Sequence, residues 1–182
     1  RPTSLGRGMP NEQVYLVDEE DRIITGPGVT GELVVRGANV MKGYWELPGE
    51  TAKMLRPGRY AWERVLYTGD LFKMDEEGFL YFISRKDDII KSRGEKVSPR
   101  EVENALYDIP GVAEAAVAGV PDDILGEAVK AYVVLKEGAD LTAEEIIAHC
   151  RSRLEDFMVP KCIEFREALR KTSSGKISKL NL

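Results

Sequence analysis

The sequence predicts an α+β protein, with a β-rich part over residues 1–86 and a compact α+β domain over residues 87–182. Strand and turn signals dominate residues 14–82, whereas helix-start signals and a helical apolar period follow residue 97. Between these regions lies a charged stretch, residues 85–88, which has neither apolar pattern. Such a stretch is typical of a connector, so we place the domain boundary within it.

Short runs of β-branched and aromatic residues, each ended by a turn signal, predict the strands of the first part. The sequence Asp-Glu-Glu-Gly between the last two runs predicts a hairpin. Tyr44 and Trp45 follow a glycine in the same part, and we expect these aromatic side chains to pack in the core. The predicted strands lie at residues 14–17, 23–24, 32–36, 71–74 and 79–83.

Two helices of the second part are predicted from their N-terminal signals. Ser98 has the residue type of an N-cap and Pro99 fits the first helical position, before apolar residues at helical spacing over 102–109. Thr142 and Glu145 form a capping-box pattern before a second apolar stripe. Strands are predicted between and after these helices, at residues 112–120, at residues 128–135 and at a short run around Cys162.

Composition and charge restrict the class of function. The 182 residues are 43% hydrophobic and 31% charged, and no apolar stretch approaches the roughly 18 residues that a membrane span requires. The net charge is −5, and because nucleic-acid binding usually requires a basic face, a nucleic-acid partner is disfavoured. A chain that begins at Arg1, in what resembles the middle of a domain, is expected to be part of a longer one.

The cysteines and the single histidine form no catalytic or metal-site pattern. Cys150 and Cys162 lack metal-ligand spacing, and we expect both to be reduced core residues of a cytoplasmic protein. His149 lies beside the apolar stripe of its helix, so we expect it to be solvated. A chain with one histidine offers no histidine-rich metal site, and a histidine-dependent protease triad is disfavoured.

Residues 67–70, Tyr-Thr-Gly-Asp, contain groups that could hold a nucleotide ribose. The carboxylate of Asp70 can accept hydrogen bonds from two adjacent ribose hydroxyls, and Gly69 would let the backbone approach the sugar. On its own, this sequence is more typical of a plain turn. Arg85 follows the predicted hairpin, so strand pairing could bring it beside Asp70.

A second candidate group is the loop of residues 170–176, which ends in Ser-Ser-Gly-Lys. Lys176 ends a short, polar, flexible loop, and such a loop could carry a cation into a cleft to offset the charge of anionic groups. The loop is not a Walker A motif, because Arg170 and Ile177 stand where that motif has glycine and serine or threonine. An isolated Ser-Gly-Lys is more typical of exposed surface.

The order and spacing of the Tyr-Thr-Gly-Asp segment, of residues 84–88 and of the lysine loop resemble the C-terminal third of an AMP-forming acyl-CoA synthetase, in the adenylate-forming ligase superfamily. The resemblance covers nearly the whole chain. It implies a β-rich remnant of a large N-terminal domain, followed by a mobile α+β lid. It also implies that Asp70 and Arg85 bind the ribose and that Lys176 acts in adenylation.

The same resemblance assigns roles to the connector and to the loop after it. Asp87 is the expected hinge about which the lid rotates. The loop that contains Lys91 and Gly94 is expected to bind the cofactor along the pantetheine tunnel, and a glycine there fits a left-handed conformation or a close backbone approach. Ser84 departs from the family, which usually has glycine at this position.

The activity implied by the resemblance has two steps. A carboxylic acid and MgATP give an acyl-adenylate and pyrophosphate, and the thiol of CoA then displaces AMP. The implied cofactors are ATP or AMP, CoA and Mg²⁺, with the magnesium ligands expected in the absent N-terminal part, so we expect this chain to be inactive alone. Two alternatives stay open: an adenylation domain that loads a carrier protein or serves a luciferase-like oxidation, and a non-catalytic binding or assembly module.

Overall fold

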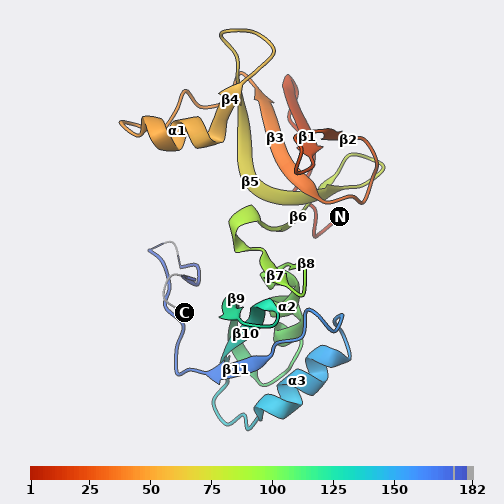
Figure 1. Ribbon diagram of the computed structural model, residues 1–182, viewed down its shortest axis with the longest axis vertical. Coiled ribbons are helices and arrows are strands. Elements are labelled where there is room, and N and C mark those ends of the chain that lie inside the picture. The colour runs from red at the N-terminus through yellow and green to blue at the C-terminus, as the bar shows by residue number, and fades with distance from the viewer. Residues whose placement is uncertain (174, 180–182) are drawn as a thin grey trace. The chain divides into compact units, whose positions relative to one another are not determined.

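The computed structural model describes residues 1–173 and 175–179 of the chain (Figure 1). By its internal packing the chain divides into two compact units, Arg1–Asp87 and Asp88–Leu182. The division lies one residue from the boundary placed on the sequence, and the assignment of the units to a large domain and a mobile lid stays a prediction. No helix in the described part of the chain exceeds nine residues, which is too short to cross a bilayer.

The first unit is built on a six-stranded antiparallel sheet, in which five strands follow the order β2-β1-β3-β5-β4 and the sixth, β6, pairs with β5. The long strand β5 pairs with β3 along one edge, and its other edge is shared by β4 at the start and β6 at the end. The elements are β1 (Glu12–Val17), β2 (Ile23–Ile24), β3 (Gly31–Gly37), α1 (Pro48–Met54), β4 (Leu55–Pro57), β5 (Arg64–Met74) and β6 (Leu80–Arg85).

Two small apolar clusters cover the two faces of this sheet. Leu16 and Phe72 are buried in one cluster, and Val17 and Val34 in the other. Because side chains alternate along a strand, the consecutive residues Leu16 and Val17 point to opposite faces. The sheet therefore has apolar packing on both sides of its centre.

Most of this sheet follows the sequence prediction, but α1 and β4 were missed. The helix α1 has seven residues, and none of its side chains is buried. Its sequence therefore has no need of apolar residues at helical spacing, which is the pattern that would have indicated a helix. The prediction for Tyr44 and Trp45 is wrong: they lie in the segment before α1 and are 44% and 88% exposed. The segment forms a turn and not a strand, so it offers these rings no sheet face to pack on.

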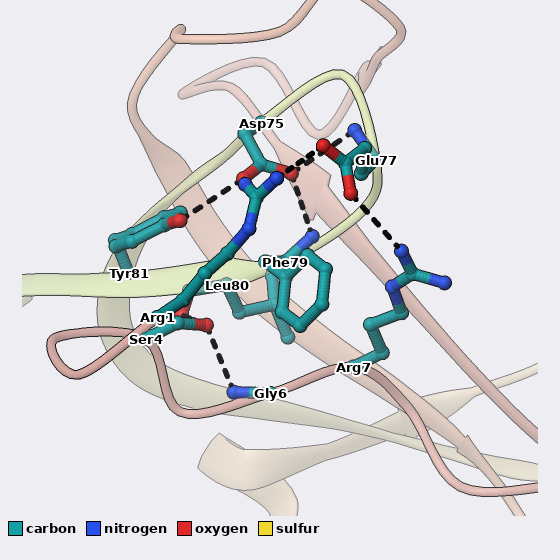
Figure 2. Close-up of polar contacts among 9 residues, drawn as sticks. All are labelled: Arg1, Ser4, Gly6, Arg7, Asp75, Glu77, Phe79, Leu80 and Tyr81. Carbon is teal, nitrogen blue, oxygen red and sulfur yellow. Dashed lines mark hydrogen bonds and ion pairs between the residues drawn. The ribbon is translucent and has the colours of Figure 1, made fainter.

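The predicted hairpin between β5 and β6 is present, and it also holds the start of the chain (Figure 2). Asp75 accepts hydrogen bonds from the backbone N–H groups of Glu77 and Phe79 and from the hydroxyl of Tyr81. Arg1 forms ion pairs with Asp75 and Glu77, and its guanidinium lies 4.7 Å from the centre of the Phe79 ring. The first residues are thus part of the first unit.

The second unit combines a five-stranded sheet with two helices (Figure 1). Strands β9 and β10 form a long hairpin, and the other edge of β10 pairs with β7 and, in parallel, with β11. The elements are η1 (Lys86–Asp88), a 3₁₀ turn across the boundary, then β7 (Ile90–Ser92), β8 (Glu95–Val97), α2 (Pro99–Tyr107), β9 (Val112–Asp122), β10 (Gly126–Leu135), α3 (Ala143–Arg151) and β11 (Cys162–Phe165).

Both helices pack on one face of this sheet, α2 against β9 and α3 against β11. On the other face, Ala116, Tyr132 and Leu169 form a smaller cluster, against which Ile177 packs. The main core between the helices and the sheet contains Ile90, Val97, Val102, Leu106, Ile109, Val112, Ala115, Val117, Val129, Ala131, Val133, Ile146 and Cys150.

Both predicted helix starts are confirmed. Ser98 is the N-cap of α2, with Pro99 in the first turn. At α3, Thr142 Oγ1 accepts a hydrogen bond from the Glu145 backbone N–H at 3.2 Å, and Glu145 Oε2 accepts one from the Thr142 N–H at 2.9 Å. A cap of this kind stabilises a helix by about 1 kcal/mol. These reciprocal bonds satisfy N–H groups that a helix leaves without intrahelical partners.

The expectations for the cysteines and the histidine hold only in part. Cys150 is buried, and burial raises the pKa of its thiol to about 11, so the thiol stays protonated at neutral pH. Cys162 is exposed, because it begins the edge strand β11. His149 is half-buried rather than solvated, and its Nε2 is enclosed without a hydrogen-bond partner in the described structure.

Asp122, at the turn between β9 and β10, should make the stability of the protein depend on pH. Lys161 and the N–H groups of Leu125 and Ile124 lower the pKa of Asp122 to about 2. A carboxyl with a lowered pKa stabilises the fold above its unfolded pKa of about 3.9, and the stabilisation is lost as the pH falls towards 2. We expect Asp122→Asn to lower the free energy of unfolding at pH 7 and to flatten its dependence between about pH 4 and 2.

Urea unfolding of the two proteins at a series of pH values measures this difference. The neighbouring exposed residue supplies the control, because Asp123→Asn should leave the profile unchanged. Identical profiles for Asp122→Asn and the unsubstituted protein would contradict the role of this ion pair.

Candidate functional site

Asp70 and Arg85 are direct partners across the β5–β6 hairpin. Arg85 Nε lies 3.2 Å from Asp70 Oδ1, and the two side chains are 51% and 29% exposed. The prediction that strand pairing brings them together is confirmed. The pair offers a partly exposed carboxylate for hydroxyl groups and a guanidinium beside it.

A bulge in β5 positions this carboxylate. Between the pairs Val34–Tyr67 and Glu32–Leu71, β3 contributes one residue and β5 contributes three, residues 68–70. Gly69, at the centre, has a φ of +69°, which strongly favours glycine. A Cβ at this position would also lie 3.6 Å from Arg85 Nη2, in contact with the arginine.

Side chains replace the strand hydrogen bonds that the bulge removes. Thr68 Oγ1 donates to the carbonyl of Leu33 at 2.8 Å and accepts from the Asp70 N–H at 3.2 Å. The Gly69 N–H donates to Glu32 Oε1 at 3.1 Å. The bulge is therefore a defined structure and not a loose turn.

The junction between the units is short. Asp87 is exposed and lies at the centre of the 3₁₀ turn η1, between β6 and β7. Ser84, where the family usually has glycine, is buried and pairs with Leu71, and the pairing of β5 with β6 shifts register directly beside it, because Phe72 pairs with Phe82. The role of Asp87 as a hinge stays a prediction.

Lys91 and Gly94 lie in a β-hairpin, whereas the sequence indicated only a loop. Ser92 pairs with Glu95, and the two residues between them, Arg93 and Gly94, have φ values of +56° and +81°. Two left-handed central residues are typical of a tight hairpin turn, so the left-handed conformation expected of Gly94 is confirmed. Lys91 is exposed, and its backbone N–H donates to the carboxylate of Glu127 at 2.7 Å.

An open cavity of about 570 Å³ lies beside this hairpin turn, within the second unit. Three cationic side chains line it, those of Arg93, Arg151 and Lys161, together with the carboxylate of Asp156 and apolar side chains that include Ile147 and Phe157. Lys161 is also paired with Asp122. No motif in the sequence indicates this cavity, because its lining comes from four separate segments. Such a mixture suits a ligand that carries both phosphate groups and an aromatic base.

Backbone hydrogen bonds form a turn within the predicted lysine loop. The Thr172 N–H donates to the Lys176 carbonyl at 2.7 Å, and the Gly175 N–H donates to the Thr172 carbonyl at 2.9 Å. Lys171 pairs with Glu114 on β9, and Ile177 packs against the sheet. The Lys176 side chain is exposed, and Ser174 of the predicted motif lies outside the described residues.

Among the described residues, no group of three or more His, Cys, Asp or Glu side chains could hold a metal ion. The candidate chemistry of the chain is therefore carried by three sets of groups. They are the Asp70–Arg85 pair, the exposed Lys176, and the hairpin turn with its cationic cavity.

Comparison with family models gives two matches. Residues 101–176 match the AMP-binding enzyme C-terminal domain, and residues 1–45 match the AMP-binding enzyme model. A long-chain-fatty-acid–CoA ligase of Bacillus subtilis (strain 168) is 48% identical over 182 residues, which is 100% of this chain and 31% of the ligase. The chain thus spans about a third of the length of this relative.

Two solved structures show the same fold with bound nucleotide. ATP-bound MatB from Rhodopseudomonas palustris aligns over 97% of this chain and 34% of its own, with a TM-score of 0.88 and 32% identity. The o-succinylbenzoate CoA synthetase MenE from Bacillus subtilis, in complex with an acyl-adenylate intermediate, aligns over 97% and 34% in the same way, at a TM-score of 0.86 and 32% identity. The chain belongs to the AMP-binding enzyme family.

Proposed function

We propose that this member of the AMP-binding enzyme family is part of an acid–thiol ligase, which joins a carboxylic acid to CoA through an acyl-adenylate. The observation that carries the proposal is the partly exposed Asp70 carboxylate, which lies on the glycine bulge beside Arg85 and could accept hydrogen bonds from ribose hydroxyls. It is supported by the B. subtilis relative named as a CoA ligase, and by similar structures that bind ATP and an acyl-adenylate.

In the first half-reaction, a carboxylate oxygen of the acid forms a bond to the α-phosphorus of ATP, and the bond from that phosphorus to the bridging oxygen breaks. Pyrophosphate leaves. Asp70 would hold the ribose hydroxyls, and Lys176 would stabilise the negative charge that develops on the α-phosphate. We assign no Mg²⁺ ligand to the described residues, because they contain no suitable cluster.

In the second half-reaction, the CoA sulfur forms a bond to the acyl carbonyl carbon, AMP leaves with the bonding pair, and the thiol proton passes to solvent. The hairpin turn at Gly94 would line the path of the pantetheine arm, with Lys91 on its first strand. The cationic cavity would hold the phosphorylated nucleotide of CoA. A carrier protein brings a pantetheine arm without that nucleotide, so the cavity favours CoA as the acceptor.

Exchange between the two half-reactions would require the second unit to rotate about Asp87. One orientation would bring Lys176 to the adenylate, and the other would bring the Gly94 turn. Each bound state would then select its own orientation, as in other hinge transitions.

Substitution of Lys176 should separate the two half-reactions. In the full-length protein, we expect Lys176→Ala to lower pyrophosphate exchange about 100- to 1,000-fold, the usual effect of removing one charge-stabilising group. Thioester formation from a supplied acyl-adenylate should stay near the original rate. Lys136→Ala, a lysine of the same unit bonded to the Pro110 carbonyl, is the control. Equal losses in both half-reactions would count against the proposal.

Substitution of Asp70 tests the proposed ribose-binding carboxylate. Asp70→Asn should raise the KM for ATP about 10- to 100-fold, because charge-assisted hydrogen bonds are each worth about 1.5–3 kcal/mol. Pyrophosphate exchange against a panel of carboxylic acids, beginning with long-chain fatty acids, measures this value. Asp21→Asn, which removes an exposed carboxylate paired with Arg56, is the matched control. An unchanged KM for ATP would overturn the ribose assignment.

Substitution of Arg151 tests the cationic cavity. We expect Arg151→Gln to raise the KM for CoA about 3- to 10-fold, the loss of one phosphate contact, and to leave pyrophosphate exchange unchanged. With pantetheine, which lacks the nucleotide, the variant and the original protein should react equally well. Arg153→Gln is the control, because Arg153 pairs with Asp108 and does not line the cavity. A defect that persists with pantetheine would place the CoA nucleotide elsewhere.

A further inference from the structure

Glu32 is a buried carboxylate whose two oxygens contact two functionally different segments. Its residue is 6% exposed, within β3 opposite the bulge. Oε1 accepts the Gly69 N–H at 3.1 Å, and Oε2 accepts a hydrogen bond from Lys86 Nζ at 2.7 Å. Gly69 belongs to the proposed ribose bulge, and Lys86 begins the turn that contains the proposed hinge.

Burying a carboxylate within a sheet is energetically unfavourable. Removing a carboxylate from water costs several kcal/mol, and the cost is offset only by well-formed hydrogen bonds and ion pairs. An apolar side chain would fill the same site without that cost. The charge of Glu32 is therefore explained by its two partners and not by packing.

The contact with Gly69 fixes the bulge. A β5 backbone that continued regularly would pair with β3, but the register gives residues 68–70 no pairing partner in β3, and Leu33 is contacted only through the Thr68 hydroxyl. Thr68 accepts the Asp70 N–H, and Glu32 accepts the Gly69 N–H. Loss of the Glu32 acceptor would leave the left-handed Gly69 less constrained, and Asp70 directly follows it.

The contact with Lys86 fixes the chain just before the junction. The Lys86 side chain is 48% exposed, whereas that of Glu32 is 7% exposed, so the anchor is the buried partner. Because the Lys86 side chain is bound to Glu32 on β3, this ion pair would tend to keep Lys86 with the first unit. This contact favours rotation that begins at the next residue, Asp87.

We propose that Glu32 is a positioning residue for the ligase reaction: one carboxylate oxygen holds the ribose bulge, and the other holds Lys86 so that the junction turns at Asp87. The inference rests on the proposed function and deepens it. Glu32 itself would contact neither ribose nor phosphate. Its effect reaches the reaction through Asp70 and through the junction.

Three substitutions in the full-length protein separate the two contacts. Lys86→Met removes only the junction contact and should lower kcat about 3- to 10-fold with an unchanged KM for ATP. Glu32→Gln keeps an oxygen for the Gly69 N–H, so it should also lower kcat and leave the KM for ATP unchanged, as Lys86→Met does. Glu32→Ala removes both contacts and should also raise the KM for ATP about 3- to 10-fold, as expected for one lost backbone hydrogen bond.

A second buried carboxylate of the same unit supplies the matched control. Glu63 is also buried; it pairs with Arg36 and accepts the Arg59 N–H at 2.6 Å, but it does not contact the bulge. Glu63→Ala should lower thermal stability and leave the KM for ATP unchanged. The double variant Glu32→Ala with Lys86→Met should lower kcat no further than Glu32→Ala alone, since both remove one ion pair.

Two outcomes would overturn the inference. One is a folded Glu32→Ala variant with the original KM for ATP, and the other is equal behaviour of the Glu32→Ala and Glu63→Ala variants. If Asp70→Asn still impairs nucleotide binding in either case, the proposed function stands and only the role of Glu32 fails. If Asp70→Asn has no effect, the proposed function itself fails.

Discussion

The β5 strand leaves its hydrogen-bond ladder with β3 at residues 68–70, and the candidate nucleotide site depends on this interruption. A bulge of this size is stable only where a residue tolerates a positive φ and where other groups take the N–H bonds that the ladder no longer accepts. Gly69 meets the first condition, and Thr68 and Glu32 meet the second. The partly exposed Asp70 carboxylate beside Arg85 is the result.

The sequence predicted the parts of the fold that local chemistry determines. The Asp-Glu-Glu-Gly turn predicted the β5–β6 hairpin, and this hairpin places Asp70 opposite Arg85. The capping residues of α2 and α3 predicted both helix starts. By contrast, α1 buries no side chain and the short hairpin of β7 and β8 lies in a charged stretch, so neither has an apolar pattern that indicates its structure.

The site was predictable only where its residues lie in recognisable segments. Asp70, Arg85 and Lys176 belong to such segments, but Glu32 acts through contacts with residues 37 and 54 positions away. The cationic cavity likewise combines side chains that the sequence separates. The exposure of Trp45 could not be predicted from its type, because burial of an aromatic side chain depends on which surfaces surround it. Local pattern thus identifies candidate groups, whereas tertiary contacts decide how they are held.

The second unit indicates where motion would have to occur if the proposed ligase alternates between two half-reactions. The Gly94 turn closes a hairpin that pairs with β10, and the Lys176 turn is held by its own backbone bonds, by the Lys171–Glu114 pair and by Ile177. Both turns are therefore attached to one packed sheet, and neither can move far without breaking contacts with it. Replacing one turn by the other at a single adenylate would then require the whole unit to rotate. A short exposed junction such as η1, with Lys86 paired to Glu32 on one side, would allow that rotation without unfolding either core.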